Sequence, residues 1–239
     1  MKPYADGREL LTAMHDRWSA RWYRTLAFSQ RTRTIAEDGR ETLGVWHEVI
    51  DHPGNLRIDF APLESGAGMI CAGDHIYQFR EGREVSRLEN WNVLLILVGD
   101  VYCQPPARTA YQLGKLGYDL LVIGPGEWQG RPGWLVGARG PGERKPQFLV
   151  DAQDLLVRRV MRCDPRLPDS PLQDVHLVTY QTVDSRPIAT AIRFHQDGRL
   201  FFCEDYYDVR VNPRLDPALF DPAMFAQRRI PDRGAVVSS

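Results

Sequence analysis

The stretch Asn55-Leu56-Arg57-Ile58-Asp59-Phe60 alternates apolar and charged side chains with a period of two. Leu56, Ile58 and Phe60 fall on one face of this segment, and Arg57 and Asp59 fall on the other. Successive side chains of a β-strand point to opposite sides, so the alternation is typical of a half-buried strand. The stretch therefore predicts an antiparallel sheet with one apolar face.

Strand-like segments continue on both sides of this stretch. Asp38-Gly39 and Gly73-Asp74 supply tight turns, because these residues tolerate the positive φ of a hairpin. His52-Pro53-Gly54 interrupts the strand pattern just before residue 55. The strands predicted in the first third of the chain are Thr25–Ile35, Thr42–Ile50, Asn55–Phe60, Gly66–Ala72 and His75–Phe79.

Three segments have a helical pattern instead. Apolar residues of the opening segment recur at helical spacing, and Pro105-Pro106 stops any continuous helix between the other two. The predicted helices are Gly7–Arg24, Glu89–Val98 and Ala107–Leu116.

Strands resume after the helical insert, and no repeat or low-complexity linker separates the two groups. Roughly ten to twelve meandering strands must curl or close, since a flat sheet of that size leaves an apolar face exposed. We therefore predict a single domain over residues 1–239, with a flexible tail over about 227–239. The later predicted strands are Asp119–Ile123, Gly133–Ala138, Gln147–Asp151, Leu155–Arg162, Val175–Val183, Ile188–His195 and Arg199–Val211.

Composition excludes several classes of protein. The 239 residues carry 30 basic and 31 acidic side chains, a formal charge of −1, which offers no basic footprint for nucleic acid. The longest apolar run, Val93–Val98, is too short to span a bilayer, so we expect no transmembrane segment. The numbered chain opens without a signal peptide. We expect a periplasmic or envelope-associated protein if a leader has been removed, and a cytoplasmic one otherwise.

Motifs for metal or covalent chemistry are missing from the sequence. Its six histidines form no HExxH pattern, and GxSxG is absent. The glycine-rich run Gly124–Gly140 lacks the Walker and dinucleotide patterns, so hairpin turns explain it better than a phosphate loop. We predict no catalytic residue, no metal and no cofactor. The cysteines lack metal-ligand spacing, and both disulfides and free thiols remain open for Cys71, Cys103, Cys163 and Cys203.

Several local signatures together resemble the family of periplasmic lipoprotein carriers and outer-membrane lipoprotein-sorting proteins. The resemblance covers residues 5–225, and it rests on the order of its motifs more than on any one of them. Gly73-Asp74 has the order of two family residues reversed. The matching segments are the opening helix, Phe28–Thr34, Gly44–Glu48, His52–Asp59, Gly73–Tyr77, Trp134, Gln147–Asp151, Leu156–Arg159, Tyr206–Asn212 and Leu219–Pro222.

This resemblance implies an unclosed, strongly curved antiparallel β-barrel of about eleven strands. Helices over residues 89–116 would form a lid above an apolar cavity that receives acyl chains. The family's carrier has a basic gating residue directly before a proline, and the matching position here is His52. The candidate cavity residues are Trp46, Leu56, Ile58, Phe60, Met69, Tyr77, Phe79, Leu94, Leu95, Val98, Trp134 and Phe148.

The leading hypothesis is a non-enzymatic, monomeric binding or transport protein for a lipid, an acyl chain or the lipid moiety of a lipoprotein. Its partners would include a membrane-bound donor or acceptor. An enzyme that uses the same cavity for a small hydrophobic substrate remains an alternative, with His47 or His75 facing inward beside Asp59 or Asp74. A third hypothesis is an envelope domain that senses or binds a partner protein.

Overall fold

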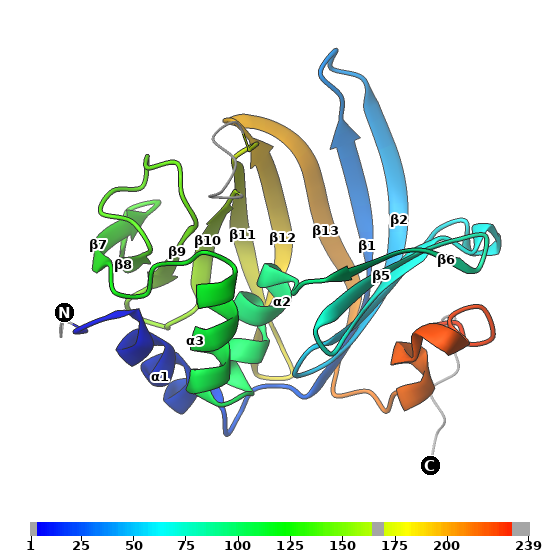
Figure 1. Ribbon diagram of the computed structural model, residues 1–239, viewed down its shortest axis with the longest axis horizontal. Helices are drawn as coiled ribbons and strands as arrows, with labels where there is room; N and C mark the ends of the chain where they lie inside the picture. The colour runs from blue at the N-terminus through cyan, green and yellow to red at the C-terminus, as the bar shows by residue number, and fades with distance from the viewer. Residues whose placement is uncertain (1–3, 164–169, 231–239) are drawn as a thin grey trace.

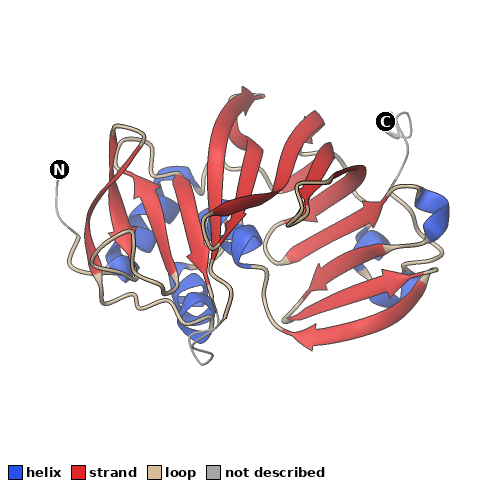
Figure 2. Ribbon diagram, turned by 90° about the horizontal axis from the view of Figure 1, so that it is seen from above, coloured by secondary structure: helices blue, strands red, loops and turns tan. Residues whose placement is uncertain are grey.

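The computed structural model describes residues 4–163 and 170–230. Thirteen strands in these ranges form one antiparallel sheet with the order β6-β5-β4-β3-β2-β1-β13-β12-β11-β10-β9-β8-β7. Figure 2 shows them side by side across the width of the molecule. The strands are β1 (Thr25–Ile35), β2 (Glu41–Asp51), β3 (Asn55–Phe60), β4 (Gly68–Ala72), β5 (His75–Arg80), β6 (Arg83–Glu89), β7 (Ile123–Trp128), β8 (Arg131–Val136), β9 (Gln147–Asp151), β10 (Val157–Arg162), β11 (Gln173–Val183), β12 (Arg186–Gln196) and β13 (Arg199–Val211).

One pairing joins the two runs of strands. Within β1–β6 and within β7–β13, each strand pairs with its neighbour along the chain, as short hairpin connections require. β1 then pairs with β13, from Leu26 opposite Val211 to Thr34 opposite Phe202. The side chain of Asn212 accepts a hydrogen bond from the Arg24 amide at 2.8 Å and fixes the end of this pairing.

The mainly β fold is confirmed, but the expected barrel is not. The sheet is neither closed nor strongly curled, and it has thirteen strands instead of about eleven. The strands that the sequence predicted wrongly lie at the two edges of the sheet. Strand β6 was not predicted, because its charged side chains hide any alternation. A strand was predicted at Asp119–Ile123, whereas β7 begins at Ile123. Charges, glycine and proline are characteristic of edge strands, which must not pair further.

The three α-helices gather on one side of the sheet (Figure 1). They are α1 (Gly7–Trp18), α2 (Val93–Val98) and α3 (Pro106–Lys115), with the 3-10 turn η2 (Asp100–Tyr102) between the last two. Asp6 caps α1 by accepting from the amides of Arg8 and Glu9. α1 ends at Trp18, six residues before the predicted end, because the chain turns there and packs the Trp22 ring against Tyr102, with 4.1 Å between ring centroids.

The main core lies between these helices and the face of the sheet that they cover, which we call the inner face. Residues of α1, α2 and α3 pack there against β8 to β12. The outer face of β1–β5 is covered instead by two C-terminal 3-10 turns, η3 (Pro217–Phe220) and η4 (Pro222–Met224). Both faces of the sheet are therefore partly buried. The small core clusters of the outer face contain Ala27, Val49, Leu219 and Phe220, and Ile70, Phe79 and Phe225.

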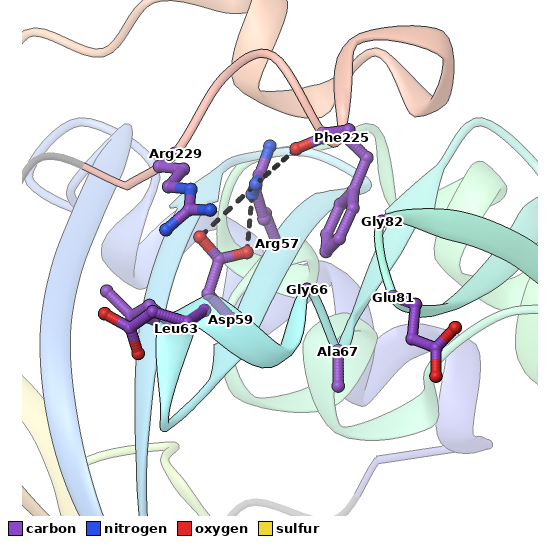
Figure 3. Close-up of a pocket in the computed structure, with 11 residues that line it drawn as sticks. Arg57, Asp59, Leu63, Gly66, Ala67, Glu81, Gly82, Phe225 and Arg229 are labelled. Carbon is purple, nitrogen blue, oxygen red and sulfur yellow. Dashed lines mark hydrogen bonds and ion pairs between the residues drawn. The ribbon is translucent and has the colours of Figure 1, made fainter.

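A buried ion pair fastens the C-terminal segment to the outer face (Figure 3). Arg57 is 1% exposed and its Nε donates to Asp59 at 2.8 Å. The same guanidinium donates to the carbonyls of Leu219 and Phe225 and lies 4.3 Å from the Phe225 ring centroid. Asp59 also accepts from the Ile230 amide at 3.2 Å. The tail predicted over 227–239 is therefore attached to the sheet as far as Ile230, through Asp59. Residues 231–239 lie outside the described ranges.

Replacing Arg57 by methionine should lower the free energy of unfolding by about 3–5 kcal/mol, because Asp59 then stays buried without its cation. Chemical denaturation of wild type and variant measures this difference. The matched control is Arg40→Met, which breaks the exposed pair with Asp38 and should cost less than about 1 kcal/mol. Equal losses in the two variants would contradict the role assigned to Arg57.

Candidate functional site

An apolar cavity lies between α2 and the inner face of the sheet. Its volume is about 110 Å³. Strands from both runs contribute to it, since β1, β2 and β3 meet β12 and β13 beneath the helix. The lining side chains are Tyr23, Leu26, Phe28, Glu48, Ile50, His52, Leu56, Ile58, Asn92, Leu94, Leu95, Val98, Ile188, Ala189, Ile192, Glu204 and Tyr206, together with Gly99.

α2 forms the roof of this cavity and also contributes to the core. Leu94, Leu95 and Val98 line the cavity, whereas Ile96 and Leu97 belong to the main core. The helix has only six residues, and Asn92 caps it by accepting from the amides of Leu94 and Leu95. A helix this short is held by its contacts and caps more than by its own hydrogen bonds.

A buried histidine–aspartate pair holds the segment that follows α2. The Nδ1 atom of His52 lies 2.7 Å from Oδ1 of Asp100, and each side chain is 1% exposed. The same carboxylate oxygen accepts from the Gly54 amide at 3.1 Å. The His52 ring also packs against Tyr23 with 5.4 Å between ring centroids. The pair therefore links the turn between β2 and β3 to the end of α2.

Gly99 is required for this contact. A Cβ atom at this position would lie 1.9 Å from Cε1 of His52 and 2.4 Å from its Nε2. The histidine ring itself is fixed by Asp100 and Tyr23, so neither side can give way without breaking the pair.

Gly99→Ala should therefore displace His52 and lower the free energy of unfolding by about 1–3 kcal/mol, as overpacking does in well-packed cores. Gly114→Ala is the matched control, because no atom lies within 4 Å of a Cβ at that helical position. The control should be neutral or stabilising by up to about 1 kcal/mol. Thermal or chemical denaturation of both variants measures the contrast, and a neutral Gly99→Ala would show that His52 is free to move.

Two glutamates bring buried carboxyl groups to the cavity. Glu48 of β2 is 6% exposed and Glu204 of β13 is 9% exposed, and both line the cavity. Burial raises the pKa of Glu204 to about 7, while the hydroxyl of Tyr206, 3.2 Å away, acts in the opposite direction. Burial, followed by the nearby Glu204, raises the pKa of Glu48 well above its usual value. The cavity thus combines an apolar wall with two weak acids.

The raised pKa of Glu204 predicts a pH dependence of stability. The folded protein holds this proton up to about pH 7, whereas the unfolded chain releases it near 4.5. The contribution of this group to the free energy of unfolding is present in full below about pH 4.5. It is lost as the pH rises to about 7, a loss on the order of 3 kcal/mol. Glu204→Gln removes the titrating proton and should remove this loss.

Chemical denaturation at about pH 5 and about pH 8 tests the effect as the difference between wild type and variant. Relative to wild type, Glu204→Gln should gain stability on going to the higher pH. The exposed control Glu41→Gln should follow wild type at both values. A constant difference between Glu204→Gln and wild type would contradict the raised pKa.

The predicted cavity residues fall into three places. Leu56, Ile58, Leu94, Leu95 and Val98 line the cavity, and His52 lies at its end. Trp46, Phe60 and Met69 extend the same apolar cluster along the inner face. Tyr77 and Phe79 pack on the outer face with Ile70 and Phe225, and Trp134 and Phe148 pack in the main core near Tyr4 and Tyr118. The structure does not bring these last four to the cavity.

The histidines proposed for an enzyme do not line the cavity. His47 lies 2.9 Å from the hydroxyl of Ser29 and opposite Asp59 on the next strand, whose side chain belongs to the outer face. His75 packs on Tyr77 at 5.9 Å between ring centroids. Residues 123–136 form the β7–β8 hairpin, which confirms the hairpin interpretation of the glycine-rich run. None of the four cysteines forms a disulfide, and the described residues contain no group of metal ligands.

Glu48 and Glu204 were not predicted as cavity residues. A signal was present, because Trp46, Glu48 and Ile50 alternate along β2, as Phe202, Glu204 and Tyr206 do along β13. An acid at i±2 from apolar residues in a strand shares their face. The proximity of the two glutamates required the β1–β13 pairing, which alternation along one strand does not reveal.

A second hollow of about 200 Å³ lies on the outer face beside the C-terminal turns (Figure 3). Arg57 and Asp59 line it together with Phe225 and Arg229. Because Arg57 and Asp59 already bind each other and the C-terminal backbone, the hollow follows from how that segment is fastened. We therefore take the cavity beneath α2 as the candidate site.

Solved structures identify the class of fold. A DUF1329 family protein from Desulfovibrio piger matches with a TM-score of 0.61 and 14% identity, over 90% of this chain and 95% of the other. A LolA superfamily protein from Nitrosomonas europaea matches with a TM-score of 0.58 and 11% identity, over 88% and 96% of the two chains. A putative outer membrane lipoprotein-sorting protein domain from Vibrio parahaemolyticus matches with a TM-score of 0.57 and 10% identity, over 92% and 98%.

The chain therefore has the fold of LolA superfamily and lipoprotein-sorting proteins, and the family resemblance is confirmed as a likeness of fold. Identities of 10–14% establish likeness of fold alone. No protein-family model and no curated protein matches the sequence. Among the described residues, every helix is too short or too polar to cross a bilayer.

Proposed function

We propose that this protein is a non-enzymatic binding protein that holds an acyl chain or another lipid-like ligand beneath α2. The observation that carries the proposal is the apolar cavity between α2 and the sheet. Each methylene group buried there contributes about 0.8 kcal/mol, so a few carbons of an acyl chain suffice to drive binding. The LolA-like fold supports the same function by analogy.

Ligand binding requires α2 to move. The cavity of about 110 Å³ is smaller than the roughly 300–1,000 Å³ of typical small-molecule sites. α2 is short and is anchored at its end by the buried His52–Asp100 pair. His52 occupies the position of the carrier family's basic gating residue, and we propose that breaking its contact with Asp100 releases α2. α3 packs beside α1 and does not line the cavity, so the proposed lid is narrower than residues 89–116.

The cell envelope is the compartment that fits this function. One similar structure is described as an outer membrane lipoprotein-sorting protein domain. By analogy, the natural ligand is a lipid or the lipid moiety of a lipoprotein, exchanged with a membrane-bound donor or acceptor. We propose a periplasmic or envelope-associated protein that acts as a monomer.

An enzyme remains the second candidate, and one observation favours it. Glu48 and Glu204 place two carboxyl groups with raised pKa values in one cavity, as acid–base catalysis often requires. The described lining contains no serine, threonine, cysteine or lysine that could act as a nucleophile. Any reaction there would depend on the two carboxyl groups, His52, the two tyrosines of the lining and water.

Displacement of a fluorescent acyl probe tests the binding function. The purified protein should bind the probe, and Ala189→Leu, which adds carbon atoms to the cavity wall, should weaken binding by about tenfold or more, because filled volume is lost to the ligand. Ala36→Leu enlarges an exposed alanine beyond the end of β1 and should bind like wild type.

Mass spectrometry of the extracted ligand separates the two functions. A carrier returns a lipid-like ligand unchanged after incubation, whereas an enzyme returns a product of different mass. Absence of probe binding, or equal binding by Ala189→Leu and wild type, would contradict the proposed function.

A further inference from the structure

The two cavity carboxyl groups lie diagonally across β1 with one amide between them. Phe28 of β1 pairs with Glu48 on one side, and Thr32 pairs with Glu204 on the other. Gln30 lies between these positions, opposite Trp46 and Tyr206. Residues two apart on a strand share a face, so all three polar side chains belong to the inner face.

Several polar atoms at this place lack a protein partner. Glu48 is 6% exposed, and the charge of the nearby Glu204 acts on its carboxyl group. Gln30 is 0% exposed, and neither its Nε2 nor its Oε1 has a partner in hydrogen-bonding geometry there. Its amide is nevertheless near enough to Glu204 to favour the ionised carboxylate. The Nε2 atom of His52, which lines the same cavity, is also buried without a partner.

Such a concentration of unpartnered groups indicates a site. Leaving one buried polar group unsatisfied costs about 1–3 kcal/mol, and the great majority of buried polar groups in folded proteins have a partner. Two other polar side chains of the lining, Asn92 and Tyr206, are engaged in the cap of α2 and in a bond to Glu204. A ligand that brings hydrogen-bond donors would satisfy the carboxyl groups.

No lysine or arginine of the described lining balances the two glutamates of the cavity. The arginines nearest to Glu204 are engaged elsewhere: Arg162 donates to Gln173 at 2.7 Å, and Arg193 bonds Asp205 at 2.6 Å and the carbonyls of Ile192 and Glu204. Neither of these two arginines lines the cavity.

We propose that the cavity selects amphiphiles whose polar end is an amine, with the ammonium group between Glu48 and Glu204 and the alkyl chain beneath α2. This inference rests on the proposed lipid-like binding function and specifies its ligand class. An ammonium group carries three donors and no acceptor, which matches two carboxylates and the Oε1 of Gln30. A fatty acid of equal length places a third carboxylate beside two others, and an alcohol supplies one uncharged donor.

The affinity for an amine should rise with pH. Binding an ammonium group favours the ionised carboxylates, and burial keeps Glu204 protonated up to about pH 7. From about pH 6 to about pH 8 the release of the Glu204 proton alone predicts an increase of about tenfold, and the raised pKa of Glu48 acts in the same direction. Several ionisable groups surround the pair. They are Tyr206 and Arg193 from β13 and β12, Arg162 from β10, Cys71 from β4, and Tyr23, His52 and Asp100 near the end of α2.

Competition of a fluorescent acyl probe against dodecylamine, dodecanol and dodecanoate, at submicellar concentrations, tests the inference. At about pH 8 wild type should bind dodecylamine about tenfold or more tighter than dodecanol, as charge-assisted hydrogen bonds are stronger than neutral ones, and dodecanoate weakest. Glu48→Gln and Glu204→Gln should each lose most of this preference and keep their affinity for dodecanol. The exposed Glu41→Gln should behave as wild type.

The outcomes separate this inference from the function on which it rests. Equal affinity of wild type for dodecylamine and dodecanol, or a preference that survives in both glutamine variants, would overturn the amine site and leave the apolar binding function intact. Binding of none of the three compounds, with no probe binding, would remove both. Because the pH dependence is measured on wild type alone, the inference stays testable even if one variant does not fold.

Discussion

The pairing of β1 with β13 is the constraint on which the rest of the structure depends. It joins a run of six strands to a run of seven and makes one sheet out of two meanders. It also places β2 and β13 on either side of β1, so that Glu48 and Glu204 share one cavity. The long-range bonds of Arg24 and Thr25 to Asn212 and Pro213 hold the end of this pairing, next to the turn that carries His52.

The helices are held on the inner face by two kinds of contact, apolar packing and a buried polar pair. Apolar packing of α1, α3 and η2 against β8–β12 fills one half of the sheet with fully buried side chains. Over β1–β3 the roof is a six-residue helix, and its anchor is a buried polar pair whose fit allows only glycine at position 99. α2 is also held by Ile96 and Leu97 in the main core, so the proposed opening of the roof needs the polar pair to break and these two side chains to shift. The outer face is fastened separately through Arg57 and the C-terminal turns.

Much of the fold could be predicted because interior strands carry clear alternation, as β3 does. The edge strands β6 and β7 could not, since charges, glycine and proline replace alternation there. The roof residues Leu94, Leu95 and Val98 and the wall residues Leu56 and Ile58 came from periodicity and from the family resemblance. Tyr77 and Phe79 lie on the outer face because β5 pairs with β4 so that Ile76 is on the inner face, and the partnership of Glu48 with Glu204 depends on a long-range pairing. Local patterns contain neither kind of information.

The location of a bound chain tests the central claim most directly. A crystal structure of the protein with 12-bromododecanol, solved with the anomalous signal of bromine, places one end of the alkyl chain without prior assumptions. The account predicts a bromine peak between α2 and the inner face of β1–β3, with α2 shifted from its position over Leu56 and Ile58. A peak in the outer hollow beside Phe225, or a bound chain that leaves the cavity beneath α2 unoccupied, would contradict it.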